Sequence, residues 1–303
     1  MWLNLLRDIF IRISRLLRGA AAGIATPVSN RVGAPVATIH QRIVKGGFVI
    51  IRPDDLEGEY ELPGASNTFA SFLRSGSYNL PVTRLLRFFA ANEGSVVIVG
   101  ADLGFWPIHI ALTFHRCHKV WAIEPDDRAY ELLVRNIHRN DLSDKVFPIP
   151  NCAWRKCTEI SLVTFPGQLG RAYVRGNQPR PDENQAGNVI KKSTVTLSAL
   201  VPDQKISLIV IDVNGSEFSV IFGARQLIER DRPILIFNCP HGMLSWYGHR
   251  SDILERLVLE LGYSCREALD TRLTLLHPFR GLVLAMHQSV AKHVFKEIAQ
   301  VRQ

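Results

Sequence analysis

Short, continuously apolar segments that alternate with helix-like segments constrain the fold of this chain most. Residues 95–100 read SVVIVG and residues 207–212 read SLIVID, without the polar alternation of a strand that has one face in water. Such strands are buried on both faces. Between them lie segments with the apolar spacing of helices, such as residues 127–140. This order predicts an α/β fold with a Rossmann-like, doubly wound, mostly parallel sheet and right-handed crossovers.

The expected elements fill residues 46–303, which we interpret as one domain. We expect strands at 48–52, 95–100, 119–123, 145–148, 160–165, 194–197, 207–212, 234–238 and 282–287, and helices at 68–72, 82–91, 106–115, 127–140, 217–229, 251–261 and 290–301. The stretch 166–192 is long, polar and without periodicity, so we expect it to be a loop that covers a substrate.

Basic charge is concentrated in the first part of the chain. The formal net charge is +8, yet residues 1–45 hold seven basic residues and one acidic residue, which leaves a nearly neutral body. A nearly neutral body gives little reason to expect a nucleic-acid partner. Residues 1–18 have the spacing of a cationic amphipathic helix, and residues 19–45 have the composition of a linker. The helix fits peripheral contact with an anionic membrane, docking on the body or a second subunit, or a transit peptide.

Cysteine and apolar content exclude several protein classes. No uncharged apolar stretch reaches the roughly 18–20 residues of a membrane-spanning helix. Five cysteines without a CxxC pair do not make a disulfide scaffold or a zinc ribbon. No carboxylate or cysteine spacing completes a metal set around His109, His115 and His118. We therefore expect no metal and a reducing, cytoplasmic location, with peripheral membrane contact left open.

Two loops that follow predicted strands have the residue types of a nucleoside pocket. In the run GADLGF, Gly100 and Gly104 let backbone approach a ligand and leave helix N–H groups free, although a tight strand–helix turn needs the same glycines. Glu124 lies twenty residues beyond Gly104, where an acid can accept hydrogen bonds from both ribose hydroxyls. The run lacks the central glycine of G-x-G-x-x-G, so S-adenosylmethionine fits better than a nicotinamide dinucleotide.

Five segments together resemble the FkbM-type methyltransferases in order and spacing. They are VVIVGADLGFWPIHIAL, WAIEPDDRAYELLVRNIHRNDL, TVTLSALV, SLIVIDVNGSEFSVIFGARQLI and PILIFN, within about residues 78–240. The family typically reads VDVGANIGYFS, FEPNP, a TLD-like segment, KIDVEGAE and a strand that ends in F-E. The resemblance implies a class I methyltransferase type of fold that binds S-adenosylmethionine. It also implies methyl transfer, usually to a hydroxyl, here on a glycan or another small-molecule acceptor.

The resemblance also implies roles for individual residues. The expected cofactor-binding residues are Gly100, Asp102, Gly104, Phe105, Glu124 and Asp212. Asp212 is the first candidate for the base that takes the acceptor's proton or orients the acceptor, with Glu217 and His241 behind it. Each has a structural alternative: a strand-end acid that caps a helix, a first-turn acid favoured by the helix dipole, and a surface turn histidine.

Departures from the family pattern favour a second function class. Ile98, Val210, Asn214 and Asn238 stand where the family has charged residues, and Asp102 stands where it has asparagine. Losing one charge-assisted hydrogen bond costs about 1.5–3 kcal/mol. Asp102 can offset one such loss by taking over the amino group of the cofactor. Several losses fit a degenerate methyltransferase fold without catalysis, which acts as a binding or scaffold module at a membrane or partner.

Overall fold

The computed structural model describes most of the chain from residue 40 onward. The described residues are 40–44, 47–75, 77–90, 92–166, 168–176, 187–201, 203–239, 243–267, 279 and 281–291. The amphipathic helix expected at 1–18 lies outside them, as does most of the helix expected at 290–301. Within the described ranges, the structure contains no helix with the length and apolar character that a bilayer crossing requires.

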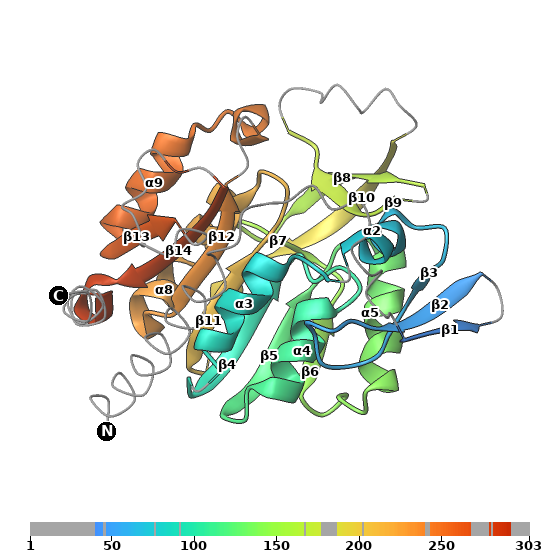
Figure 1. Cartoon of the computed structure of the whole chain (residues 1–303). Coiled ribbons are helices and arrows are strands. Elements are labelled where there is room, and N and C mark those ends of the chain that lie inside the picture. Colours follow the sequence, from blue (N-terminus) through green and yellow to red (C-terminus); the bar gives the residue numbers. More distant parts are fainter. Residues whose placement is uncertain are drawn as a thin grey trace, which may run out of the picture.

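A seven-stranded sheet forms the centre of the molecule (Figure 1), in the order β13-β14-β12-β11-β4-β5-β6. Its strands are β4 Gly94–Val99, β5 Cys117–Ile123, β6 Val146–Ile149, β11 Ile206–Ile211, β12 Ile234–Cys239, β13 Tyr263–Glu267 and β14 Gly281–His287. Neighbours from β12 to β6 are parallel, whereas β14 is antiparallel to both β12 and β13. The predicted Rossmann-like, mostly parallel sheet of the class I methyltransferase type is confirmed.

Helices cover both faces of this sheet. They are α2 Asn67–Ser75, α3 Leu80–Phe88, α4 Phe105–Thr113, α5 Asp127–Arg139, α6 Leu197–Leu200, α7 Glu217–Gly223, α8 Arg225–Asp231 and α9 Ser251–Glu260, with a 3-10 helix, η1, at Met243–Tyr247. Side chains of β4 alternate between the two cores. Val96 and Ile98 pack with α3, α4 and α5, and Val97 and Val99 pack with α7, α8 and α9. This double burial explains the unbroken apolar run.

Two smaller sheets flank the central one. The first contains β1 His40–Val44, β2 Phe48–Arg52 and β3 Tyr60–Pro63, all antiparallel, and lies on the side opposite to β13 and β14 (Figure 1). Strand β1 falls inside the stretch that we interpret as a linker. The second has the order β7-β10-β8-β9, with β7 Cys152–Ala153, β8 Glu159–Phe165, β9 Gln168–Val174 and β10 Asn188–Val195.

The expectation of an unstructured loop at 166–192 is wrong. Strand β9 occupies Gln168–Val174 and β10 starts at Asn188, while residues 177–186 lie outside the described part. Strand β9 pairs only with β8, so it needs no continuous apolar run and its sequence, QLGRAYV, gave no strand signal. The single helix expected at 217–229 is also interrupted. It consists of α7, which ends at Gly223, and α8, which starts at Arg225. The chain passes close to Trp154 at this interruption, because an added Cβ on Gly223 would lie 2.1 Å from the carbonyl oxygen of Trp154.

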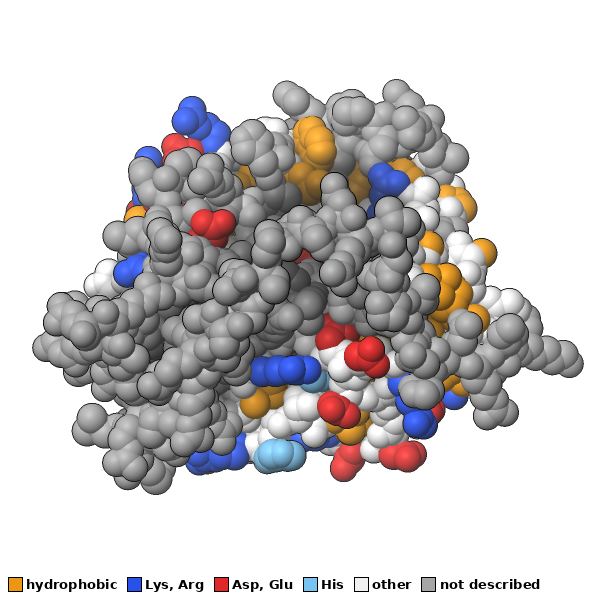
Figure 2. Space-filling view, viewed as in Figure 1, with side chains coloured by type: hydrophobic (Ala, Val, Ile, Leu, Met, Phe, Trp, Pro, Cys, Tyr) orange, Lys and Arg blue, Asp and Glu red, His pale blue; other side chains and the backbone are white. Residues whose placement is uncertain are grey.

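Charged side chains are mixed on the visible surface. In Figure 2, acidic and basic side chains lie next to one another where described residues are visible. Both signs of charge are thus present among them, in keeping with the nearly neutral charge of residues 46–303.

Candidate functional site

A cleft opens where the central strands β4, β5 and β11 end. Its empty space is about 700 Å³ when the part open to solvent is counted. The loops after these three strands form one wall, and residues of β7, β8 and β9 form another. From β4 the chain runs to β5 on one side and later to β11 on the other, so the cleft lies at a topological switch point.

Gly100 brings two of these loops into contact. It has φ +82°, and an added Cβ would lie 2.1 Å from the carbonyl oxygen of Asp212. The backbone N–H of Asp212 donates to the carbonyl of Val99 at 3.0 Å, which fixes the same junction from the other strand. Only glycine fits this position, because the two protein backbones meet there, and the predicted approach of this backbone to a ligand stays a prediction.

Glu124 joins the β4 and β5 loops. One carboxylate oxygen accepts from the backbone N–H of Asp102 at 2.8 Å, and the other accepts from the N–H of Asp126 at 2.9 Å. Burial, together with the charge of Asp102, raises the pKa of Glu124 to about 8. Each carboxylate oxygen has a second lone pair, so Glu124 can still accept two hydroxyl hydrogens from a ligand in the cleft.

Asp102 lines the cleft with an unsatisfied carboxylate. Its side chain is 9% exposed, and its buried Oδ1 has no hydrogen-bond partner among the described residues. Burial raises its pKa to about 7, with further contributions from Asp126 and Asp212. The residue has φ +48°, which aspartate and asparagine tolerate better than most residues. Gly170 of β9 packs against the carboxylate, since a Cβ there would lie 3.3 Å from Oδ2.

The structure separates the predicted catalytic residues. Asp212 lines the cleft, its Oδ1 accepts from Asn238 Nδ2 at 3.4 Å, and burial raises its pKa. Glu217 is 0% exposed and lies beneath the loop, where one oxygen accepts from the N–H of Gly215 at 3.2 Å. It does not belong to the described lining of the cleft, so its catalytic role stays a prediction without a described contact to the cleft. His241 lies outside the described residues.

Two predicted cofactor contacts also have another role. Gly104 has φ +97° at the start of α4, and an added Cβ would lie 2.9 Å from Leu133 Cδ1, so it allows close packing of α4 on α5. The ring of Phe105 is buried among aromatic side chains, 4.9 Å from Tyr60 and 4.2 Å from Tyr78 between centroids. Neither residue belongs to the described lining of the cleft, so contact of either with a cofactor stays a prediction.

Tyr78 is a site residue that the sequence motifs do not indicate. It lies between α2 and α3, stacks on Phe105 and lines the cleft. Burial raises its pKa well above the ordinary value, with further contributions from Asp102, Asp212 and Glu124. The phenol therefore keeps its proton and serves as a hydrogen-bond donor. In the sequence, it is marked only by its position between two expected helices. The fold then brings this connection to the cleft.

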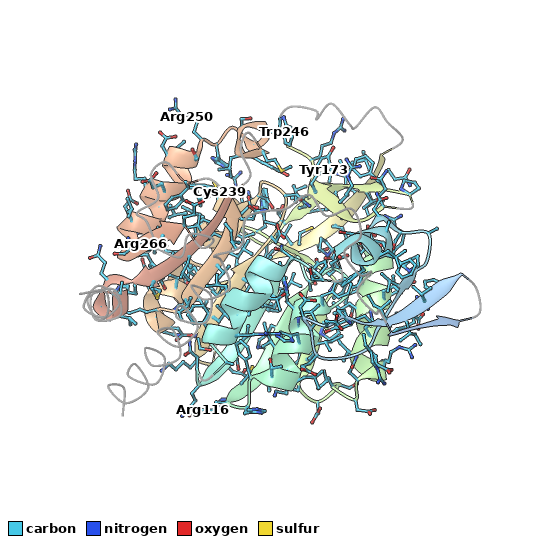
Figure 3. All side chains as sticks on the ribbon, in the orientation of Figure 1. Arg116, Tyr173, Cys239, Trp246, Arg250 and Arg266 are labelled. Carbon is cyan, nitrogen blue, oxygen red and sulfur yellow. The ribbon has the colours of Figure 1, made fainter. Side chains whose placement is uncertain are left out.

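Strand β9 covers the cleft and is held by the β11–α7 loop. Asn214, with φ +56°, donates from Nδ2 to the carbonyls of Ala172 at 3.1 Å and Gly170 at 3.4 Å. At the end of β9, the hydroxyl of Tyr247 in η1 donates to the carbonyl of Val174 at 2.7 Å. Figure 3 shows Tyr173 of β9 and the neighbouring Trp246 of η1 at the same end of the molecule. Strand β9 is thus a structured cover of the cleft.

The cleft is acidic. Asp102, Glu124 and Asp212 line it, and none of its described lining residues is lysine, arginine or histidine. Three carboxyl groups in a confined space repel one another and favour a cationic ligand. Within the described ranges no group of three or more histidine, cysteine, aspartate or glutamate residues is arranged to hold a metal ion.

Comparison with known proteins identifies the family. The model of the methyltransferase FkbM domain matches residues 99–265, which is more than half of the chain. The chain belongs to the FkbM methyltransferase family. The FkbM match contains the loops after β4, β5 and β11, whereas Tyr78, β1 to β3 and β14 lie outside it. No curated protein gave a significant match.

Solved structures resemble this FkbM chain at low identity. An FkbM methyltransferase from Methylobacillus flagellatus is 16% identical over 73% of this chain and 48% of its own, with a TM-score of 0.43. An S-adenosylmethionine-dependent O-methyltransferase from Thermotoga maritima is 11% identical over 78% and 77% of the two chains, with a TM-score of 0.40. A TehB-like methyltransferase from Corynebacterium glutamicum is 10% identical over 72% and 91%, with a TM-score of 0.40. The chain thus spans about half the length of the first.

Proposed function

We propose that this protein is an S-adenosylmethionine-dependent methyltransferase that acts on a hydroxyl of a glycan or another small-molecule acceptor. The acidic cleft carries the proposal, because Asp102, Glu124 and Asp212 face it without a described basic side chain. S-adenosylmethionine has a sulfonium, an ammonium and one carboxylate, and therefore a net positive charge. A nicotinamide dinucleotide brings two negative phosphates, which the same carboxylates would repel. The family match supports the same choice.

The residues divide into holding and reacting roles. Glu124 accepts the ribose hydroxyls, and Gly100 keeps the loops after β4 and β11 in contact at the wall of the cleft. The bound cofactor supplies a methyl group whose bond to sulfur breaks as the acceptor oxygen bonds to carbon. Asp212 is the candidate base for the hydroxyl proton, because it lines the cleft and burial raises its pKa toward the working range of a general base.

Calorimetric titration with S-adenosylmethionine tests the cofactor assignment. We expect binding by the wild type and at least about tenfold weaker binding by Glu124→Gln, because the amide keeps the shape but loses acceptor capacity. Glu131→Gln is the matched control, because it removes the same charge from an exposed position on α5. If the wild type does not bind S-adenosylmethionine, the proposal is wrong and the non-catalytic alternative is favoured. That alternative predicts that the protein binds vesicles through residues 1–18.

Transfer of a labelled methyl group to hydroxyl-bearing glycans and small molecules tests the reaction. Asp212→Asn removes the proposed base while it leaves an amide that can still bond to Asn238. We expect the variant to lower kcat by about 10²–10⁴-fold, as loss of general base catalysis does. An unchanged kcat, with transfer measured on the same acceptor, would exclude Asp212 as the base.

A further inference from the structure

Two positions of the β4 motif, four residues apart, differ from the family pattern in opposite ways. Ile98 occupies the strand position where the family has an acid, and Asp102 occupies the loop position where it has asparagine. Ile98 is 0% exposed within the core formed with α3, α4 and α5. The strand end therefore offers no charge to a ligand, and the carboxylate of this motif lies four residues later.

Asp102 has the features of a group that awaits a cationic partner. Oδ1 is buried, has no hydrogen-bond partner among the described residues, and belongs to a side chain that lines the cleft. A buried carboxylate oxygen without a donor is costly, so a structural role alone would not retain it. Its backbone N–H binds Glu124, which places the side chain next to the proposed ribose position.

Nearby groups leave Oδ1 of this carboxylate without a donor, although a backbone hydrogen bond from Leu103 contributes to the environment of the group. Asp126, the neighbouring acid that contributes most to its charge environment, is paired with Arg128 at 2.8 Å. Gly170 presents no side chain, and an added Cβ there would lie 3.3 Å from Oδ2, so the glycine offers no donor to the carboxylate from a side chain. Tyr78 lines the same cleft, yet Oδ1 of Asp102 has no hydrogen-bond partner among the described residues, so a ligand in the cleft can supply the donor.

We propose that Asp102 binds the ammonium group of the amino-acid part of the cofactor and replaces the acid that Ile98 has displaced from the strand end. This inference rests on the proposed function. Asp102 then selects for ligands with an amino group, while Glu124 selects for the ribose. The departures at 98 and 102 form one compensating pair, so they preserve cofactor binding.

The test uses two ligands and two proteins. The ligands are S-adenosylhomocysteine and its deaminated analogue, in which hydrogen replaces the amino group. The protein variant is Asp102→Asn, which restores the residue of the family pattern and keeps a side chain that tolerates the positive φ. We expect the wild type to prefer the amino ligand by about tenfold to a hundredfold, as for a charge-assisted hydrogen bond, and Asp102→Asn to lose this preference.

The outcomes separate this inference from the proposed function. If Asp102→Asn weakens both ligands equally, or keeps the preference for the amino ligand, the assignment is wrong. If the wild type binds neither S-adenosylmethionine nor S-adenosylhomocysteine, the proposed function fails and this inference fails with it. Thermal unfolding of the unliganded proteins supplies the structural control. We expect Asp102→Asn to unfold at or above the wild-type temperature, because it removes an unpaired buried charge.

Discussion

At the scale of single residues, Gly100 has the closest backbone contact of the cleft. Gly100→Ala would place a Cβ 2.1 Å from the carbonyl oxygen of Asp212, whereas Gly281→Ala, also at positive φ, would meet nothing within 4 Å. In both variants, the left-handed conformation of the new alanine lowers the free energy of unfolding by about 1–2 kcal/mol. We expect Gly100→Ala to lose a further 1–3 kcal/mol or so, as overpacking does. Urea unfolding of both variants measures the difference, and equal losses would contradict the contact.

Glu217 gives a pH dependence to the stability of the unliganded protein. Burial raises its pKa to about 7 from an ordinary value near 4.5, so its stabilising contribution is complete below about 4.5 and is lost as pH rises through 7. The free energy of unfolding should therefore fall between pH 5 and pH 7, by up to about 1.4 kcal/mol per pH unit for this group. Glu217→Gln should reduce that slope in urea unfolding, and Glu131→Gln should leave it unchanged.

At the scale of elements, Asn214 links the β11–α7 loop to the strand that covers the cleft. Its side chain donates to two carbonyls of β9. Asn214→Gly removes these bonds and keeps the positive φ, whereas Asn214→Ala also adds backbone strain. In hydrogen exchange we expect amides of Gln168–Val174 to exchange about tenfold faster in Asn214→Gly, for a loss near 1.4 kcal/mol. Unchanged protection would show that β8 alone holds β9.

Asn136 connects α5 to both β3 and the loop after β4. Its Nδ2 donates to the carbonyls of Leu103 at 2.9 Å and Glu61 at 3.1 Å, and its Oδ1 accepts from the N–H of Glu61 at 2.6 Å. Asn136→Ala would leave these buried groups unsatisfied, at about 1–3 kcal/mol each. Asn140→Ala removes similar bonds to Glu59 from a half-buried position, where water can replace them. We expect chemical unfolding to give the clearly larger loss for Asn136.

At the scale of the whole molecule, the part of the chain before the family match belongs to the same core as the match. Fully buried side chains at Ile51, Leu62, Phe72 and Leu86 pack in one cluster with α4 and α5. Each contributes about 1.5–3 kcal/mol, and together they approach the whole stability of a domain. A chain that begins at residue 92 should show no cooperative thermal transition, whereas the full chain should show one.

The central sheet could be predicted from the sequence because its strands are buried on both faces. Strands β4 and β11 have apolar runs that only double burial explains, and the loops after them contain Gly100 and Asp212. Strand β9 could not be predicted in this way, since it pairs on one side and contains Gly170. The site was partly predictable for the same reason. Glu124 follows from its spacing, but Tyr78 reaches the cleft through tertiary packing alone.

The charge of the cleft bears on how the enzyme would release its product. Methyl transfer converts a positively charged sulfonium into a neutral thioether, while Asp102, Glu124 and Asp212 remain in place. If the protein works as proposed, the cleft would lose part of its attraction for the cofactor at the moment of reaction, which would favour departure of the spent form and limit product inhibition. We expect calorimetry to give a lower Kd for S-adenosylmethionine than for S-adenosylhomocysteine, with a smaller ratio in Asp212→Asn. The acidic lining would then favour exchange of the spent cofactor for a new one.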